Sequence, residues 1–299
     1  MKIFYSSDDT FDANFDELLQ RGKMDIEGVT GIVSGLLKEI QTEGNSAVKS
    51  QIAKFDRWEP ANDEALLVST EEMAKAYDAI DPELRDALHL SYDRIENYHQ
   101  KLMPKTWMDK EANGTILGQK VTAVDRAGLY IPGGKAAYPS SLLMNVIPAQ
   151  VAGVNEIVVC TPTPDDEINE LLLAACHLCK VTKVFKVGGA SAIGAMAYGT
   201  ETIPKVDVIT GPGNIFVATA KKLVYGEVNI DMIAGPSEIG ILADESARED
   251  YIAMDLLSQA EHGADSQVIL VTDSEILADA SLKKVQKQLN VLSRKELAG

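Results

Sequence analysis

Two hydrophobic patterns divide the chain. In residues 28–55 and in the segment that starts at Asp81-Pro82, apolar side chains recur every three or four positions, which predicts amphipathic helices. The second of these helices is expected to end at Pro104, and residues 69–72 form a capping box that predicts another helix start. Residues 1–23 show only weak periodicity and are expected to form an extended arm.

From Thr115 onward, short apolar runs alternate with turns and with helix candidates. This alternation is typical of an open, mostly parallel sheet with helices on both faces, and no fixed repeat length accompanies it. The predicted fold class is therefore α/β, with doubly wound, Rossmann-like sheets. The turns contain Pro132-Gly133-Gly134, Thr161-Pro162-Thr163-Pro164, Gly188-Gly189, Gly211-Pro212-Gly213-Asn214 and Ala234-Gly235-Pro236-Ser237, and two further strands are expected at 238–243 and 267–272.

Composition narrows the class of protein. A chain of 299 residues is long enough for one large domain or two, and its 45% hydrophobic and 24% charged residues are ordinary for a globular protein. The net charge of −17 argues against nucleic acid and anionic membranes as partners. No targeting segment is expected, and the apolar stretch 141–154 is too short and too polar to span a bilayer. Three cysteines leave one unpaired, which fits a reducing cytoplasm.

The glycine turns predict where a ligand binds. Doubly wound sheets bind ligands beyond the carboxyl ends of their strands, where glycine and helix N-termini let phosphates approach the backbone. Gly211-Pro212-Gly213 resembles the start of a GxGxxG fingerprint, but the third glycine position holds Phe216. Asp231 follows Gly211 by twenty residues, where a ribose-binding acid is expected. A plain tight turn, without a dinucleotide, remains the alternative.

Histidine and cysteine pairs elsewhere do not predict a metal site. Cys176 and Cys179 form a CxxC inside a predicted helix, but Cys160 is the only other cysteine, so a zinc ribbon lacks its second pair. Buried structural cysteines are expected instead. His89 and His99 are ten residues apart and do not share a helical face, so we expect neither to bind metal.

The segment 230–262 brings together the polar residues of greatest interest. A turn that contains Ser237 precedes a strand, and a helix is expected to end at His262, with Gln259 three positions earlier on the same face. Physical chemistry alone does not select glutamine as a zinc ligand, since thiolate, imidazole and carboxylate are the usual donors. By itself, the Gln259–His262 pair is more typical of a helix end at the surface.

The same segment resembles the signature of histidinol dehydrogenase, although Gly240 and Met254 are unusual at their positions. The matching residues are Ile230-Asp231, Ala234-Gly235-Pro236-Ser237-Glu238, Asp255-Leu256-Leu257-Ser258 and Glu261-His262. Three earlier blocks resemble the family as well: YIPGG, VGGASAIGAMAYGTE and GPGNIFVATAKK.

The resemblance implies zinc-dependent oxidation of L-histidinol to L-histidine through histidinal, with two NAD molecules, in histidine biosynthesis. It implies NAD binding by Tyr130, Ser191 and Asn214, although the family usually has glutamine at the position of Ser191. It implies substrate binding by Ser237, Gln259 and His262, the last two also as zinc ligands. The implied lobes are 1–128 with 238–299 for substrate and zinc, and 129–237 for NAD.

Family members are longer than this sequence. The resemblance implies that the acid–base Glu-His pair and the remaining zinc ligands lie in a C-terminal region absent here, so no catalytic base is expected in this chain. That region is also implied to interlock a homodimer. Two other interpretations stay open: a non-catalytic NAD-binding protein derived from the same fold, and an unrelated zinc hydrolase on a similar sheet, which would need zinc but not NAD.

Overall fold

The computed structural model describes residues 2–20, 26–133, 138–233, 237–262, 266–292 and 295. The chain forms two compact units, one from residues 26–234 and one that joins residues 1–25 to 235–299. Each unit has its own hydrophobic core. None of the helices in the described residues is long and apolar enough to cross a membrane.

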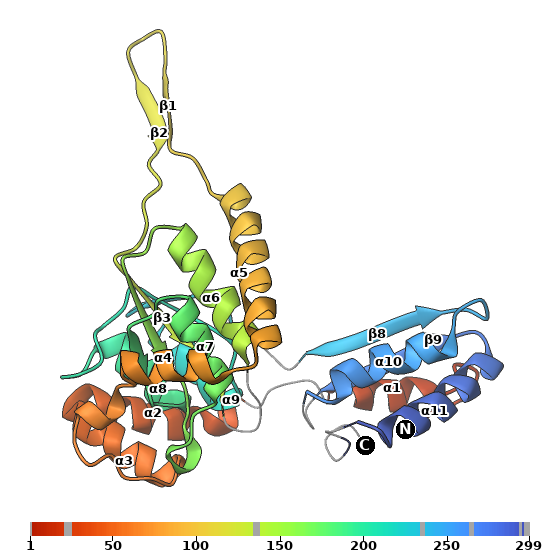
Figure 1. The fold of residues 1–299 in the computed structure, drawn as a ribbon. Coiled ribbons are helices and arrows are strands. Elements are labelled where there is room, and N and C mark those ends of the chain that lie inside the picture. Colours follow the sequence, from red (N-terminus) through yellow and green to blue (C-terminus); the bar gives the residue numbers. More distant parts are fainter. Residues whose placement is uncertain are drawn as a thin grey trace. The chain divides into compact units, whose positions relative to one another are not determined.

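A parallel five-stranded sheet organises the larger unit (Figure 1). Its strands lie in the order β5-β4-β3-β6-β7, so the first strand of the sheet in sequence, β3, is central. The order reverses between β3 and β6, which makes their carboxyl ends a topological switch point, the place where such sheets bind ligands. The strands are β3 (Arg126–Tyr130), β4 (Glu156–Cys160), β5 (Lys183–Phe185), β6 (Val208–Thr210) and β7 (Asn229–Ile230).

Helices cover both faces of this sheet because successive strand residues point to opposite sides. Tyr130 packs into the hydrophobic core on one face of the sheet, and Leu129 packs into the hydrophobic core on the other face. The first face carries α2 (Ile26–Glu43), α3 (Asn45–Phe55), α8 (Gly189–Tyr198) and α9 (Ile215–Val224). The second carries α4 (Thr70–Ala79), α5 (Pro82–Leu102), α6 (Pro139–Val151) and α7 (Glu170–Leu178), and single 3-10 turns lie at Glu64–Leu66 and Pro164–Asp166.

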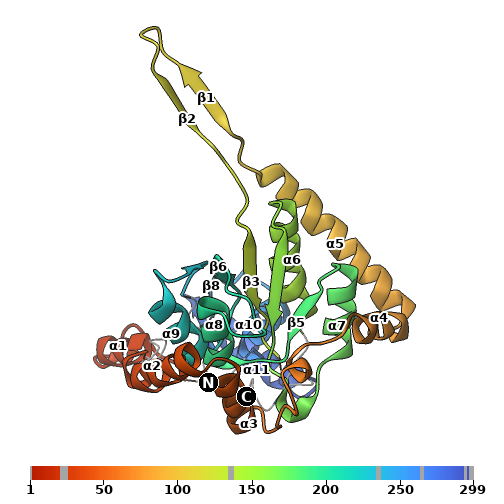
Figure 2. The same cartoon turned by 90° about the vertical axis from the view of Figure 1, so that its left-hand side faces the viewer.

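An antiparallel hairpin projects from the larger unit beyond the end of α5 (Figure 2). Its strands are β1 (Trp107–Lys110) and β2 (Ile116–Gln119), and every residue of both is exposed. The turn spans Glu111 to Gly114, closed by a hydrogen bond from the Gly114 amide to the Glu111 carbonyl at 3.0 Å, and Gly114 has a φ of +91°. Glycine is favoured at this last position of a hairpin loop because it adopts positive φ without strain.

The smaller unit is built around a parallel two-stranded sheet, β8 (Glu238–Ala243) and β9 (Gln267–Thr272). The helices of this unit are α1 (Phe11–Gln20), α10 (Glu249–Ala260) and α11 (Glu275–Leu289). Ile252, Leu256 and Leu277 form part of its core. The expectation of an extended arm at the N-terminus is wrong for residues 11–20, which are helical.

The predicted α/β class with open, mostly parallel sheets is confirmed. The larger unit extends beyond the segment 129–237 that was predicted for the NAD lobe, because helices α2 to α5 pack against the sheet or its covering helices. Which unit serves cofactor and which serves substrate stays a prediction.

Candidate functional site

Tyr130 is the last residue of β3 and lies at the switch point. Its side chain is buried, and its hydroxyl oxygen accepts a hydrogen bond from the Gly189 amide at 3.3 Å. Burial raises the pKa of Tyr130 from its ordinary value to about 12, so the phenol is neutral at physiological pH. The bond joins the end of β3 to the start of α8, where Gly189 has a φ of +59°. The contact of Tyr130 with NAD stays a prediction.

Ser191 lies in the first turn of α8 and is buried. Its hydroxyl donates to Gln51 Oε1 on α3 at 2.6 Å, and Gln51 Nε2 donates in turn to the Leu36 carbonyl and to Glu39. In this structure the hydroxyl therefore belongs to a polar network between helices. The contact of Ser191 with NAD stays a prediction.

Asn214 caps α9 at the carboxyl end of β6. Its Oδ1 accepts hydrogen bonds from the amides of Phe216 and Val217 at 3.1 and 3.2 Å. The side chain is exposed, so its Nδ2 group is open to solvent at the same sheet edge as Tyr130. The sequence pattern places it there because Asn is among the most favoured N-cap residues.

The turn at Gly211 brings the ends of β3 and β6 together. Gly211 has a φ of +118°, and a Cβ atom there would lie 2.0 Å from the Tyr130 carbonyl oxygen. Asp231, considered above as a ribose-binding acid, instead accepts from the Gly211 amide at 2.9 Å and pairs with Lys221. This arrangement favours the interpretation of 211–214 as a tight turn whose neighbouring acid has a structural role.

The signature residues lie in the smaller unit. Ser237 is exposed just before β8, and Ala234, Gly235 and Pro236 of the signature turn lie outside the described residues. Gln259 is in the last turn of α10, but the helix ends at Ala260, so His262 follows it in a turn. The His262 amide donates to the Gln259 carbonyl at 3.1 Å. Gln259 Nε2 donates to Ser266 Oγ at 3.4 Å.

The metal-binding capacity of the described residues is limited. They contain no group of three or more His, Cys, Asp or Glu side chains arranged to hold a metal ion. The role of Gln259 and His262 as zinc ligands stays a prediction, and a catalytic zinc needs at least three protein ligands. The expectation of buried, unpaired cysteines is confirmed for Cys160, Cys176 and Cys179.

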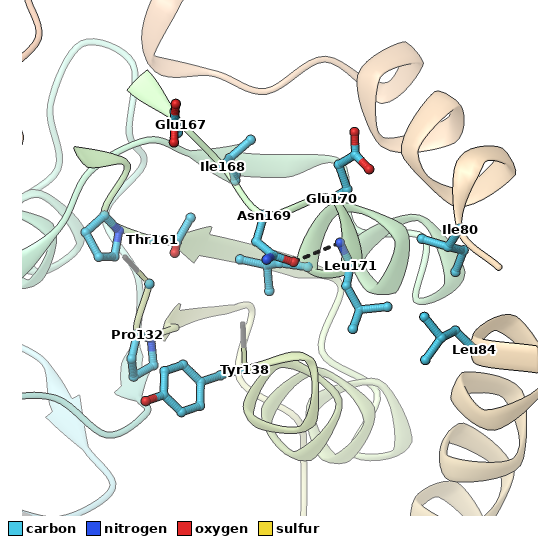
Figure 3. A pocket seen from close by; sticks show the side chains of 13 residues that line it. Ile80, Leu84, Pro132, Tyr138, Thr161, Glu167, Ile168, Asn169, Glu170 and Leu171 are labelled. Atoms are coloured by element: carbon cyan, nitrogen blue, oxygen red, sulfur yellow. Dashed lines mark hydrogen bonds between the residues drawn. The ribbon is translucent and has the colours of Figure 1, made fainter. Parts of the chain in front are cut away.

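A cavity of about 560 Å³ also lies at the carboxyl ends of β3 and β4 (Figure 3). The sequence does not mark the residues of this cavity as a group. They come from the loops after both strands, from the N-cap of α6, from the first turn of α7 and from the junction of α4 and α5, segments that only the fold brings together. The signal available in the sequence was the run 161–164, a turn at the edge where ligands bind.

Comparison with known proteins decides the family. The family model described as histidinol dehydrogenase matches residues 19–299. The chain belongs to the histidinol dehydrogenase family. It is 65% identical over 293 residues to the histidinol dehydrogenase of Sulfurimonas denitrificans, a match that covers 98% of this chain and 68% of that protein. It is 62% identical over 298 residues to that of Wolinella succinogenes, covering 100% of this chain and 69% of that protein.

A solved structure agrees with this assignment. The crystal structure of histidinol dehydrogenase from Elizabethkingia anophelis is 38% identical in sequence and superposes with a TM-score of 0.86, covering 96% of this chain and 66% of that one. The chain thus spans about two thirds of the length of these family members. The family resemblance inferred from the signature and the glycine blocks is confirmed.

Proposed function

We propose that this chain acts in the cytoplasm, as part of a homodimer, in the oxidation of L-histidinol to L-histidine through histidinal. This reaction is the last step of histidine biosynthesis, with NAD as hydride acceptor and zinc as the bound metal. The observation that supports the proposal most strongly is 65% identity, over 98% of the chain, to a protein named histidinol dehydrogenase.

NAD would bind at the switch point of the larger unit, beside Tyr130 and Asn214. The start of α8 is suited to the diphosphate, because Gly188 caps the helix without a side-chain hydrogen bond. The first amide of this helix, that of Gly189, already donates to Tyr130, so the phosphate would be bound by the amides that follow it. The neutral phenol of Tyr130 provides a ring against which a base or nicotinamide can pack. Ser191 would reach the cofactor only after its hydroxyl leaves Gln51, or through a bridging water.

Ser237, Gln259 and His262 would hold the amino alcohol and the zinc. Zinc has no redox chemistry, so when bound it supplies charge that orients and polarises the substrate. The exposed Ser237 hydroxyl can donate to or accept from the substrate. His262 is exposed at the end of α10, and its imidazole is accessible. Further ligands would have to come from residues other than those described.

Hydride transfer also needs a base that removes the hydroxyl proton of the substrate. In residues 1–299, Glu261-His262 is the only Glu-His pair, and it belongs to the signature. We therefore expect residues 1–299 to bind NAD and to produce little or no NADH, with the acid–base pair supplied by sequence that the longer relatives contain.

The test is NADH formation at saturating L-histidinol and NAD with added zinc. Purified residues 1–299 would be compared with the longer relative from Sulfurimonas denitrificans, and NAD binding to each would be measured by calorimetry. Activity in the long protein and NAD binding without turnover in the short one are the expected results. Zinc-dependent turnover by residues 1–299 would contradict the assignment of the base elsewhere.

The alternative is a non-catalytic NAD-binding protein. Two observations on the described residues favour this alternative: Ser191 is buried, and the set of metal ligands is incomplete. It would bind NAD with an affinity that neither zinc nor histidinol changes. For the proposed enzyme, histidinol and zinc should instead protect residues 1–299 against thermal unfolding, since any ligand that binds only the folded state stabilises it.

A further inference from the structure

The hairpin arm, residues 101–121, comprises the end of α5 and the projecting hairpin, and it carries large apolar side chains on both of its faces. The cross-strand register places Trp107 and Leu117 on one face of the hairpin. It places Met108 and Ile116 on the other face. In the order named, these four residues are 53%, 54%, 78% and 61% exposed. Neither face of the hairpin is therefore the polar surface that water normally covers.

The arm has little to hold it in place besides its own main chain. At its base the Val121 amide donates to Thr106 Oγ1 at 3.0 Å, and near its tip the Glu111 amide donates to the Thr115 carbonyl at 2.8 Å. The sheet has only two strands, and every residue of both is exposed. A two-stranded hairpin by itself is at best marginally stable in water, and exposed apolar patches mark surfaces that bind a partner. A surface that covers the arm would supply the burial that it lacks.

The arm is also a basic segment of an acidic chain. Residues 101–120 contain four lysines and two acidic residues, so their net charge is +2 in a chain of −17, and the rest of the chain carries −19. Neither Lys110 nor Lys120 forms an ion pair with another described residue. Their charges thus remain available to an acidic partner.

We propose that the hairpin arm docks on a second copy of this chain and forms part of a homodimer interface. The acidic remainder of a second copy complements the arm in charge, whereas the same acidic remainder repels nucleic acid and anionic membranes. In a dimer with two-fold symmetry each arm contacts the other copy, so the contact is made twice. The inference rests on the homodimer of the proposed function and is independent of the reaction that the protein catalyses.

Ile116→Ser tests the apolar part of this contact, with Ile32→Ser as its matched control. Both isoleucines belong to the larger unit, and their exposed fractions, 61% and 58%, are nearly equal, but Ile32 lies on α2. Both variants should keep the melting temperature of the native protein, because neither side chain is buried. The dimer Kd of residues 1–299, measured by sedimentation velocity, should rise about fivefold to tenfold in Ile116→Ser alone. Trp107→Ser should raise it about tenfold or more.

Lys110→Glu tests the electrostatic part, with Lys38→Glu on α2 as its control. Reversing a charge of the arm places it against a surface of the same sign, so the dimer Kd should rise about tenfold, while the control should leave it unchanged. Raising the salt concentration from about 50 to about 500 mM should weaken the native dimer severalfold, because salt screens the attraction. A native dimer that salt tightens would contradict the assignment of the arm to an acidic surface.

Trp107 also allows docking to be observed at the arm itself. The chain has two tryptophans, so Trp58→Phe leaves Trp107 as the single indole fluorophore. Its emission maximum should shift to shorter wavelength as the protein concentration rises through the dimer Kd, since the indole ring leaves water. An unchanged emission maximum in a protein that sediments as a dimer would place the contact elsewhere and overturn the inference.

The remaining outcomes separate the arm from the proposed function. If Ile116→Ser, Trp107→Ser and Lys110→Glu all dimerise as the native protein does, the homodimer stands and the arm is not its interface. If residues 1–299 stay monomeric at every concentration, the inference is overturned, while the proposed reaction is unaffected. If that monomer instead binds phosphatidylglycerol vesicles through Lys110, the arm has another occupant and the second copy is excluded. Turnover of L-histidinol tests the reaction and changes none of these results.

Discussion

Lys221 and Asp231 together fix the main chain of Gly211. Lys221 Nζ donates to the Gly211 carbonyl at 3.0 Å and pairs with Asp231 Oδ1, while Asp231 Oδ2 accepts from the Gly211 amide at 2.9 Å. The Lys221 side chain is 3% exposed and that of Asp231 is 31% exposed. The pair therefore fixes the turn between β6 and Asn214, the N-cap of α9.

The unequal burial of this pair predicts unequal costs of substitution. Asp231→Asn leaves a buried ammonium group without its counter-charge and should lower the free energy of unfolding by about 3 kcal/mol. Lys221→Met leaves a carboxylate that water and two amides still solvate, so its cost should be smaller, about 1–2 kcal/mol. Urea unfolding of the two variants measures both. Equal costs, or the reverse order, would show that Lys221 is not as desolvated as its burial indicates.

Gly211 itself should not tolerate a side chain. Gly211→Ala places a methyl group 2.0 Å from the Tyr130 carbonyl at a φ of +118°, and we expect a loss of more than about 2 kcal/mol in unfolding free energy. Gly35→Ala is the control, because Gly35 lies in helix α2 with no atom within 4 Å of its added Cβ. That variant should be more stable by about 0.5–1 kcal/mol. A Gly211→Ala protein as stable as Gly35→Ala would contradict the tight approach of β3 and the turn.

The three cysteines should be unreactive in the folded protein. Burial raises the pKa of Cys160 and of Cys176, and it raises the pKa of Cys179 from its ordinary value to about 12. Since the thiolate is the reactive form, modification by a disulfide reagent at pH 8 should be slow in the native protein. All three thiols should react at once in guanidinium. A rapidly reacting native thiol would show that one cysteine is accessible.

Stability should also fall in alkali because of Tyr130. Its pKa is about 12 in the folded protein against an ordinary value of 10.0, so the folded state binds the proton more tightly. The stabilising contribution is complete below pH 10 and is lost as pH rises toward 12. Between pH 10 and 11, Tyr130 should account for a loss of about 1 kcal/mol, and Tyr130→Phe should lose correspondingly less over that interval. If the free energy of unfolding falls equally with pH in the native protein and in Tyr130→Phe, Tyr130 is not the cause of the alkaline loss.

Much of the sheet could be predicted because each apolar run precedes a glycine or proline turn. Tyr130, Gly211 and Asn214 were placed at one edge on that basis, and the structure brings Tyr130 and Gly211 into contact. The packing partners of helices α2 to α5 could not be predicted. Hydrophobic periodicity identifies the apolar face of a helix, but it does not identify the element against which that face packs. The exposed hairpin has no buried face and hence no hydrophobic pattern, although its Asn113-Gly114 pair was a usable signal.

Side-chain networks explain the remaining differences. The partner of Ser191 is Gln51, 140 residues earlier in the chain, and no local motif predicts that bond. Asp231 lies twenty residues after Gly211, a spacing that suits a ribose-binding acid. In the structure its carboxylate instead forms an ion pair with the buried Lys221. Sequence spacing identifies which groups are available at an edge, while the folded structure determines which of them are already hydrogen-bonded to protein.

Asn214 allows its structural and cofactor-binding roles to be separated. Asn214→Ala removes the acceptor for the Phe216 and Val217 amides and should cost about 1 kcal/mol of stability. Asn214→Asp keeps that acceptor, so stability should be retained, but it replaces the Nδ2 donor by a negative charge at the proposed NAD site. We expect the Kd for NAD to rise about tenfold in the Asp variant, measured by calorimetry. If Asn214→Asp binds NAD as tightly as the native protein does, Asn214 serves only to cap α9 and the cofactor contact must be assigned to another residue.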